Sequence, residues 1–209
     1  MCVEKLKYEH VLIVVFVLLT GMMQSPTAKA QSTTDSIFLT NSSKVIFKCD
    51  RTDITAEQRQ WVIDSIVPKL RELGDNGYVF GRSAASPEGP YENNRRLANG
   101  RRETIKAIFE KEGINTSRIR FDTAIEEYDL LLEMMRQRKD PDYEFVKYVV
   151  ETRNHDDIAI KKALQNAQDG KLFARLLKEY FPELRAVHVD EVPRPELERL
   201  LRVVAEAHG

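Results

Sequence analysis

An arginine and an asparagine occupy the apolar side of one predicted helix. On a helical wheel that starts at Leu97, Arg101 falls at about 40° and Asn94 at about 60°. The same arc holds the apolar side chains of Ala98, Ile105, Ile108 and Phe109. A cation in an apolar stripe costs free energy unless something pairs with it. Arg101 could form an internal salt bridge or extend its charged end out at the sheet edge. It could also bind the carboxylate of a ligand through a bidentate fork, and spacing alone leaves both interpretations open.

A strand and a stiff turn precede this helix. The segment from Tyr78 to Arg82 is typical of a strand, and Pro87, Gly89 and Pro90 shape the turn that follows. Because the helix begins beside this turn, its free backbone N–H groups and its dipole favour an anionic group there. The elements around Arg101 are thus suited to a negatively charged ligand.

The motif in this region resembles that of a known family. Asn94-x-x-Leu97-x-x-x-Arg101 is similar to the Asn-x-x-Leu-Ser-x-x-Arg-Ala motif of OmpA-like peptidoglycan-binding domains. The turn Ala85-Ser86-Pro87-Glu88-Gly89 resembles the family variant in which Ala-Ser-Pro-Glu-Gly replaces Thr-Asp-x-x-Gly. The resemblance covers roughly residues 44–121 and a final strand near residues 185–192.

The resemblance implies a ligand and roles for four residues. Arg101 would hold a carboxylate of diaminopimelate in the peptidoglycan stem peptide, a carboxylate of the turn would take the ammonium group, and Asn94 would orient the turn. The family aspartate of the turn lies fifteen residues before the arginine, and this sequence has Ser86 there. Serine accepts a hydrogen bond but carries no charge, so Glu88 is the candidate substitute. The predicted peptidoglycan-binding residues are Arg101, Asn94, Ser86 and Glu88.

The N-terminal segment predicts export. Lys5 and Lys7 precede an apolar run over residues 11–23, and Ala28-Lys29-Ala30 matches a cleavage site. Residues 1–30 are therefore predicted to be a cleaved signal peptide. The run is short of the about 20 residues that span a bilayer, although an uncleaved anchor is the alternative. We expect no membrane span after cleavage, and the resemblance implies a periplasmic location in association with the outer membrane of a Gram-negative bacterium.

The rest of the chain predicts an α/β domain, a two-layer α+β sandwich with a β-α-β-α-β core. Its expected parts are a flexible tether (31–43), an OmpA-like domain (44–193) with a helical insertion before the last strand (about 123–181), and a C-terminal helix (194–209). Within the domain we expect strands at 44–49, 78–82, 118–121 and 184–192. Thr55 and Gln58 predict a capping box at the start of a helix that reaches Leu73, with a kink at Pro68.

Other residues predict neither catalysis nor metal binding. The four histidines lack metal-ligand spacing, and the chain carries no nucleophile elbow or phosphate-binding loop. A net charge of −1 gives no electrostatic footprint for nucleic acid. The pairs Glu126-Glu127 and Asp156-Asp157 are interpreted as solvated helix faces, and Cys49 as a buried residue of the first strand. We expect a protein without enzymatic activity, cofactor or metal.

Two functions fit these observations. The first is an exported protein that contacts peptidoglycan through Arg101. The second is a protein-interaction or assembly factor that keeps the scaffold without the ligand and docks through the helical insertion and the terminal helix on an envelope or surface-appendage complex. A large exposed apolar patch on the insertion would favour the second.

Overall fold

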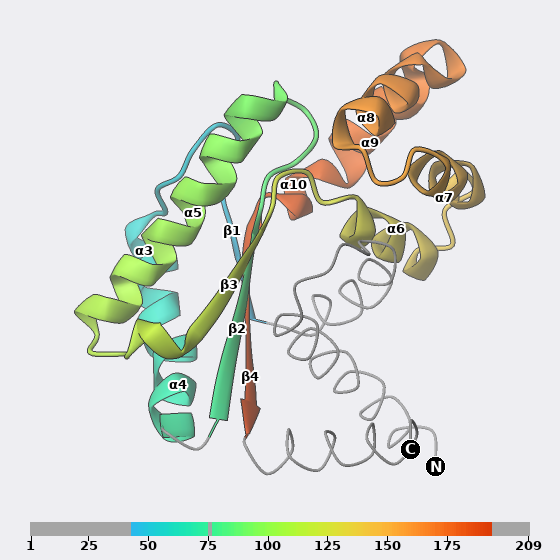
Figure 1. Ribbon diagram of the computed structural model, residues 1–209. Coiled ribbons are helices and arrows are strands. Elements are labelled where there is room, and N and C mark those ends of the chain that lie inside the picture. Colours follow the sequence, from blue (N-terminus) through green and yellow to red (C-terminus); the bar gives the residue numbers. More distant parts are fainter. Residues whose placement is uncertain (1–42, 75–76, 194–209) are drawn as a thin grey trace, which may run out of the picture.

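The computed structural model describes residues 43–74 and 77–193, which form a sheet layer, a helical layer and a helical insertion (Figure 1). The strands are β1 (Ser43–Ile46), β2 (Gly77–Ala84), β3 (Ile119–Ala124) and β4 (Ala186–Pro193), in the sheet order β1-β4-β2-β3. β2 pairs parallel to β3, and β4 pairs antiparallel to both β1 and β2. The predicted α/β class and the β-α-β-α-β core are confirmed.

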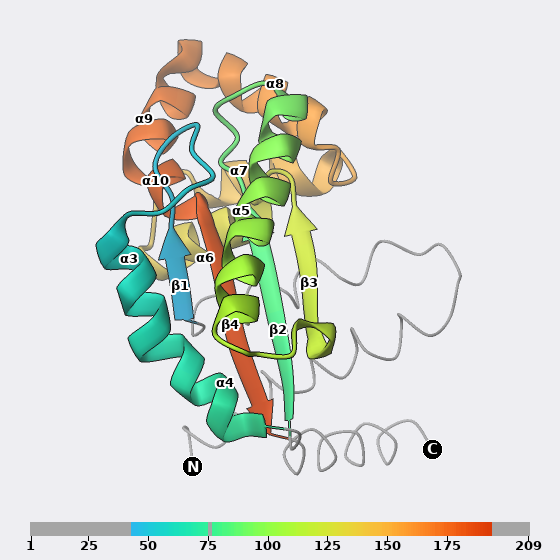
Figure 2. The ribbon, with the colours of Figure 1, turned by 90° about the vertical axis from the view of Figure 1, so that its left-hand side faces the viewer.

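Helices cover one face of the sheet, while the insertion lies beyond one end of it (Figures 1 and 2). The covering layer consists of α3 (Ala56–Trp61), α4 (Val67–Leu73) and α5 (Tyr91–Lys111). The insertion consists of α6 (Tyr128–Gln137), α7 (Tyr143–Thr152), α8 (Asp157–Asn166), α9 (Lys171–Glu179) and α10 (Phe181–Leu184). Short 3-10 turns at Thr116–Arg118 and Ala167–Gly170 lead into β3 and α9.

The first helix starts as the sequence predicts. Thr55 accepts a hydrogen bond from the Gln58 backbone N–H, and the Gln58 side chain accepts one from the Thr55 N–H, at 3.2 and 3.1 Å. Two N–H groups that the helix cannot satisfy are thus bonded. The expected effect of Pro68 takes the form of a π-helical segment (Val62–Ile66) between α3 and α4. Proline lacks an N–H, and the wider turn just before it absorbs the interruption.

The described residues contain two hydrophobic cores that hold these elements together. The first lies between the sheet and its helices and includes Val45, Phe47, Ile66, Ile105, Phe109 and Val187. The second lies inside the insertion and includes Leu131, Met135, Val146, Leu164, Leu176 and Phe181. Met134 and Met135 are core residues of the insertion. The insertion therefore has an apolar core of its own, separate from that of the sheet.

Several predicted features lie outside the described residues: the signal peptide, most of the tether and the C-terminal helix. Among the helices that the structure describes, none is both long and apolar enough to cross a membrane. The prediction that Cys49 is a buried residue of the first strand is wrong. β1 ends at Ile46, and Cys49 is exposed in the following loop, next to Asp50 with its positive φ of 52°.

Candidate functional site

The guanidinium of Arg101 is fully buried and contacts two segments at one end of the sheet. Its Nη1 donates to the carbonyl of Ala84, the last residue of β2, at 2.8 Å. Its Nε and Nη2 donate to the carbonyls of Arg51 and Lys48 at 3.1 and 3.4 Å. The ring of Phe47 lies 5.4 Å from the guanidinium carbon. Arg101 thus joins helix α5 to the end of β2 and to the loop that follows β1.

The positive charge of Arg101 has no carboxylate partner among the described residues. Burial, followed by the nearby charge of Arg185, lowers its pKa to about 10, so the group stays charged at neutral pH. Backbone carbonyls bond three of its five N–H groups. A buried cation held only by neutral acceptors keeps most of its desolvation cost. The internal salt bridge that the sequence left open for Arg101 is therefore not found in the described part of the chain.

The loop after β1 covers Arg101 because it packs tightly on α5. Thr104 donates its hydroxyl hydrogen to the carbonyl of Thr52 at 2.6 Å. Gly100 makes room for this approach, since a Cβ at that position would lie 2.7 Å from Cγ2 of Thr52. Residues 48–52 consequently form a cover, which we call the Arg101 cover loop.

Glu88 and Ser86 lie together beside the Arg101 cover loop. The Oε1 atom of Glu88 accepts hydrogen bonds from Ser86 Oγ at 2.7 Å and from Arg185 Nη1 at 2.8 Å, and Cys49 Sγ lies 3.5 Å away. Burial acts to raise the pKa of Glu88, but the bonds from Ser86 and Arg185 hold it below its usual value. The carboxylate of the turn is therefore ionised and already paired with a cation.

Asn94 contacts the turn from the first part of α5. Its Nδ2 donates to the Gly89 carbonyl at 3.2 Å and to Oε1 of Glu126 at 2.7 Å, and the residue is buried. Lys161 of α8 also donates to the Gly89 carbonyl, at 2.7 Å, and forms an ion pair with Glu126. Asn94 and Lys161 thus fix the turn against the insertion.

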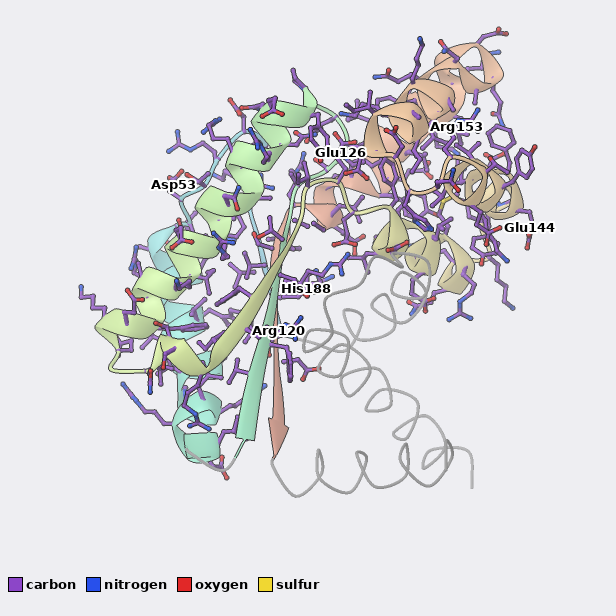
Figure 3. All side chains as sticks on the ribbon, viewed as in Figure 1. Asp53, Arg120, Glu126, Glu144, Arg153 and His188 are labelled. Atoms are coloured by element: carbon purple, nitrogen blue, oxygen red, sulfur yellow. The ribbon has the colours of Figure 1, made fainter. Side chains whose placement is uncertain are left out.

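Buried carboxylates follow β3, which corrects the interpretation of Glu126-Glu127 as a solvated helix face. Glu126 and Glu127 are 5% and 1% exposed. Glu126 pairs with Lys161 and accepts the Tyr128 hydroxyl at 2.8 Å, while Glu127 pairs with Arg82. In Figure 3, Glu126 lies where the end of the sheet meets the insertion, whereas Arg120 and His188 lie further down the sheet.

A cavity of about 270 Å³ adjoins these carboxylates and is also lined by Arg82 and by Asp157 of α8. Burial, together with the charges of Glu126 and Glu127, raises the pKa of Asp157 to about 7. No group of metal-ligating side chains is found in the described ranges 43–74 and 77–193. The cavity is thus an acidic space whose walls come from both the sheet and the insertion.

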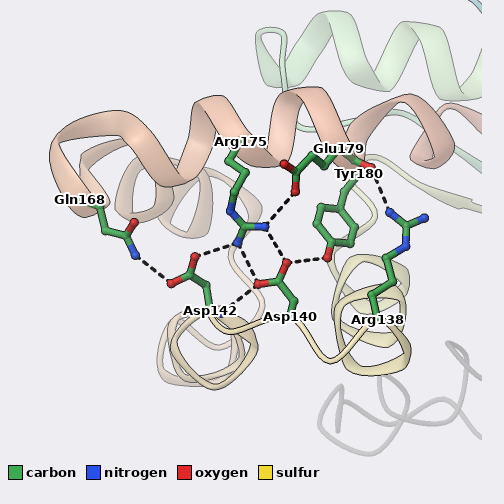
Figure 4. A network of polar contacts seen from close by, with 7 residues as sticks. All are labelled: Arg138, Asp140, Asp142, Gln168, Arg175, Glu179 and Tyr180. Atoms are coloured by element: carbon green, nitrogen blue, oxygen red, sulfur yellow. Dashed lines mark hydrogen bonds and ion pairs between the residues drawn. The ribbon is translucent and has the colours of Figure 1, made fainter.

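A second polar network lies wholly within the insertion (Figure 4). Arg175 of α9 forms ion pairs with Asp140, Asp142 and Glu179 at 2.6 to 3.0 Å. The hydroxyl of Tyr180 donates to Asp140 at 2.6 Å. All of these groups have partners, so the network fixes the loop before α7 against α9.

The structure brings all four predicted site residues to the same end of the sheet. Arg101, Ser86 and Glu88 surround or adjoin the Arg101 cover loop, and Asn94 lies on the side of the insertion. Sequence reasoning missed Arg185 and Lys161, which contact the turn from ninety-seven and seventy-two positions further along the chain. No local pattern marks Lys161, whereas the position of Arg185 just before the buried strand β4 was a signal that its charge would need a partner.

Comparisons with known proteins give a likeness to solved structures only. No protein-family model matches the sequence, and no curated protein matches it either. Among solved structures, the C-terminal domain of Helicobacter pylori MotB (residues 125–256) is similar, with a TM-score of 0.43 and 11% identity. The match covers 80% of this chain and 98% of that chain.

Proposed function

We propose that this protein is a non-enzymatic cell-envelope protein that contacts peptidoglycan through a stem-peptide carboxylate bound by Arg101. The observation that carries the proposal is the buried charge of Arg101, which has no carboxylate partner among the described residues. A ligand carboxylate would supply that partner. Two N–H groups of Arg101 are not bonded to backbone carbonyls and could donate to it. The resemblance of residues 85–101 to OmpA-like domains supplies the identity of the ligand.

Access to Arg101 requires the cover loop to move. Lys48 and Arg51 contribute two of the three carbonyls that the guanidinium contacts, and the Lys48 contact is the longest at 3.4 Å. A carboxylate that replaced these two acceptors would exchange neutral carbonyls for an anion, and the bidentate ion pair would add charge attraction to the hydrogen bonds. We propose that residues 48–52 lift when the ligand binds, while the bond to Ala84 keeps the guanidinium in place.

The other predicted residues have supporting roles in this proposal. Ser86 and Glu88 line the site from the turn, and Asn94 holds the turn through the Gly89 carbonyl. The chain would be exported by the signal peptide at residues 1–30 and would act in the periplasm, in association with the outer membrane. A separate envelope protein would contact the insertion.

Co-sedimentation with purified peptidoglycan sacculi tests the proposal. The wild-type protein should pellet with sacculi, and free diaminopimelate-containing stem peptide should release it. Arg101→Gln should stay in the supernatant, whereas Arg95→Gln should pellet like the wild type, because Arg95 is an exposed residue of the same helix. Circular dichroism of both variants checks their folding. Equal pelleting of wild type and a folded Arg101→Gln would refute the role of Arg101.

A second candidate function is protein interaction through the insertion, and the exposure of apolar side chains favours it. Phe145, Tyr148, Ile158 and Leu177 of the insertion are 40–63% exposed. Photo-crosslinking from position 148 in cells would test this function, with position 61 as the control because Trp61 is exposed on α3, outside the insertion. A defined adduct from position 148 alone would support docking on the insertion, and its absence would refute this candidate.

A further inference from the structure

The charge of Glu88 is paired with Arg185 before any ligand arrives. One of its oxygens accepts from Ser86 and Arg185 and lies within contact of the Cys49 thiol. The ion pair with Arg185 is sheltered from water, since the two side chains are 21% and 15% exposed. A ligand ammonium that approached Glu88 would have to share this carboxylate with the guanidinium of Arg185, whose positive charge weakens the attraction that the ammonium feels.

Among the described residues, this sheltered region holds the guanidinium groups of Arg101 and Arg185 and the ionised carboxylate of Glu88. Arg101 and Arg185 are close enough for the charge of Arg185 to lower the pKa of Arg101. A further nearby carboxylate, that of Asp50, is exposed and pairs with Arg96 at 3.3 Å. In the turn itself, the position of the family aspartate holds the uncharged Ser86. In the part of the chain that the structure describes, the region therefore has an excess of positive charge, and the carboxylates of Glu88 and Asp50 are both already paired with cations.

Arg185 also has an unused donor. Its Nε atom is buried, and no acceptor for it is found among the described residues. A buried N–H without an acceptor costs free energy that a ligand oxygen could recover. Arg185 thus adds a second hydrogen-bond donor for an anion, close to Arg101.

We propose that the site selects a carboxylate whose neighbouring amine is acylated over a carboxylate that carries a free ammonium group. This inference rests on the proposed function and names the form of the stem peptide that binds. In a peptidoglycan cross-link, the side-chain amine of diaminopimelate becomes an amide, while its carboxylate stays free. The site is therefore specific for cross-linked stem peptides, and Arg185 determines this specificity by neutralising Glu88.

A matched pair of probes tests the specificity. The first is the tripeptide L-Ala-γ-D-Glu-meso-diaminopimelate, and the second is the same tripeptide acetylated on the side-chain amine. The protein is purified from a Gram-negative host that expresses the full chain, and binding is measured by isothermal titration calorimetry at low salt. The acetylated tripeptide should bind about tenfold more tightly, because it brings the anion without the repelled cation.

Two variants of one ion pair should move this preference in opposite directions. Arg185→Gln leaves Glu88 free to receive an ammonium group. The affinity for the free-amine tripeptide should therefore rise relative to the affinity for the acetylated one. Glu88→Gln removes the only carboxylate of the turn, so the preference for the acetylated tripeptide should grow. If Arg185→Gln fails to fold, Glu88→Gln still carries the test, since glutamine keeps the shape and an acceptor oxygen.

The outcomes separate this inference from the proposed function. Tighter binding of the free-amine tripeptide by the wild type would overturn the specificity and leave peptidoglycan binding intact. A protein that pellets with sacculi but binds neither tripeptide would also overturn it, because the carboxylate would not be the recognised group. Failure to bind sacculi and both tripeptides would overturn the proposed function itself.

Discussion

The guanidinium of Arg82 donates two hydrogen bonds, at 2.8 and 2.9 Å, to the two carboxylate oxygens of Glu127. Arg82 belongs to β2, and Glu127 lies at the start of the insertion, immediately before α6. The side chain of Glu127 is 1% exposed and that of Arg82 is 16% exposed. This bidentate pair therefore fastens the insertion to the last part of β2, an inner strand of the sheet.

Removing one partner of this pair should be costly. Arg82→Met leaves the buried Glu127 carboxylate without its cation, and we expect a loss of about 3–5 kcal/mol in the free energy of unfolding. Arg82→Met/Glu127→Leu should recover most of that loss, because apolar replacement of both partners is often close to neutral. Urea denaturation of the two variants measures the difference. If Arg82→Met is as stable as the wild type, the ion pair does not stabilise the fold.

The acidity of the cavity predicts how stability depends on pH. The pKa of Asp157 is raised to about 7 in the folded state by burial and by Glu126 and Glu127, with Lys161 acting in the opposite direction. Between about pH 4 and pH 7 the folded state therefore binds more protons than the unfolded state, so stability falls as pH rises through this window.

Asp157→Asn should flatten this slope and stabilise the protein at pH 8 by about 1–2 kcal/mol, less than the full shift because the side chain is partly exposed. Thermal unfolding between pH 4.5 and pH 8 would measure both effects. Glu144→Gln is the control, since Glu144 is an exposed carboxylate of α7 (Figure 3). The same slope in wild type and Asp157→Asn would show that Asp157 is not the titrating group.

The network around Arg175 predicts the opposite pH behaviour within the insertion. Hydrogen bonds from Arg175 lower the pKa of Asp140 to about 2, with Tyr180 as a further donor. Asp140 therefore stabilises the fold above its unfolded pKa near 4, and this contribution is lost as pH falls through about 2. Arg175→Met should cost about 2 kcal/mol at pH 7. Hydrogen exchange should show that amide protection in α7 and α9 falls in this variant. Unchanged protection in both helices would contradict the stabilising role of the network.

Gly100 provides a direct test of the Arg101 cover loop. Gly100→Ala places a Cβ 2.7 Å from Cγ2 of Thr52, so the loop must move away from α5. We expect faster hydrogen exchange at residues 48–52 in this variant. Thr52→Ser removes Cγ2, and in that background alanine at position 100 should be tolerated or even stabilising, by up to about 1 kcal/mol, because alanine favours helix. Equal exchange rates at residues 48–52 in Gly100→Ala and wild type would refute the tight packing.

Local patterns predicted the elements well because their causes are local. The capping box needs only Thr55 and Gln58, three residues apart, and the apolar arc of α5 is a repeat within one helix. The same repeat placed Arg101 and Asn94 inside the fold, where both are found. The helical content of the insertion and the position of the last strand followed from similar patterns.

Long-range ion pairs account for what sequence reasoning missed. Glu127 is buried only because Arg82, forty-five residues earlier, neutralises it, and Glu126 needs Lys161 for the same reason. Arg185 reaches Glu88 across ninety-seven residues. A sequence of charged residues looks solvated until the fold supplies the opposite charge. The partners of the candidate site therefore required the structure, whereas its central arginine did not.

The place of β4 in the sheet also determines when the domain can fold. β4 lies between β1 and β2, although it follows the insertion in the chain. Until residues 186–193 are available, β1 has no neighbour in the sheet, and β2 pairs on one side only. Such non-local pairing is slow to form because a long loop must close first. The sheet should therefore stay incomplete until nearly all of the domain has been synthesised, even though the insertion can form its own core earlier.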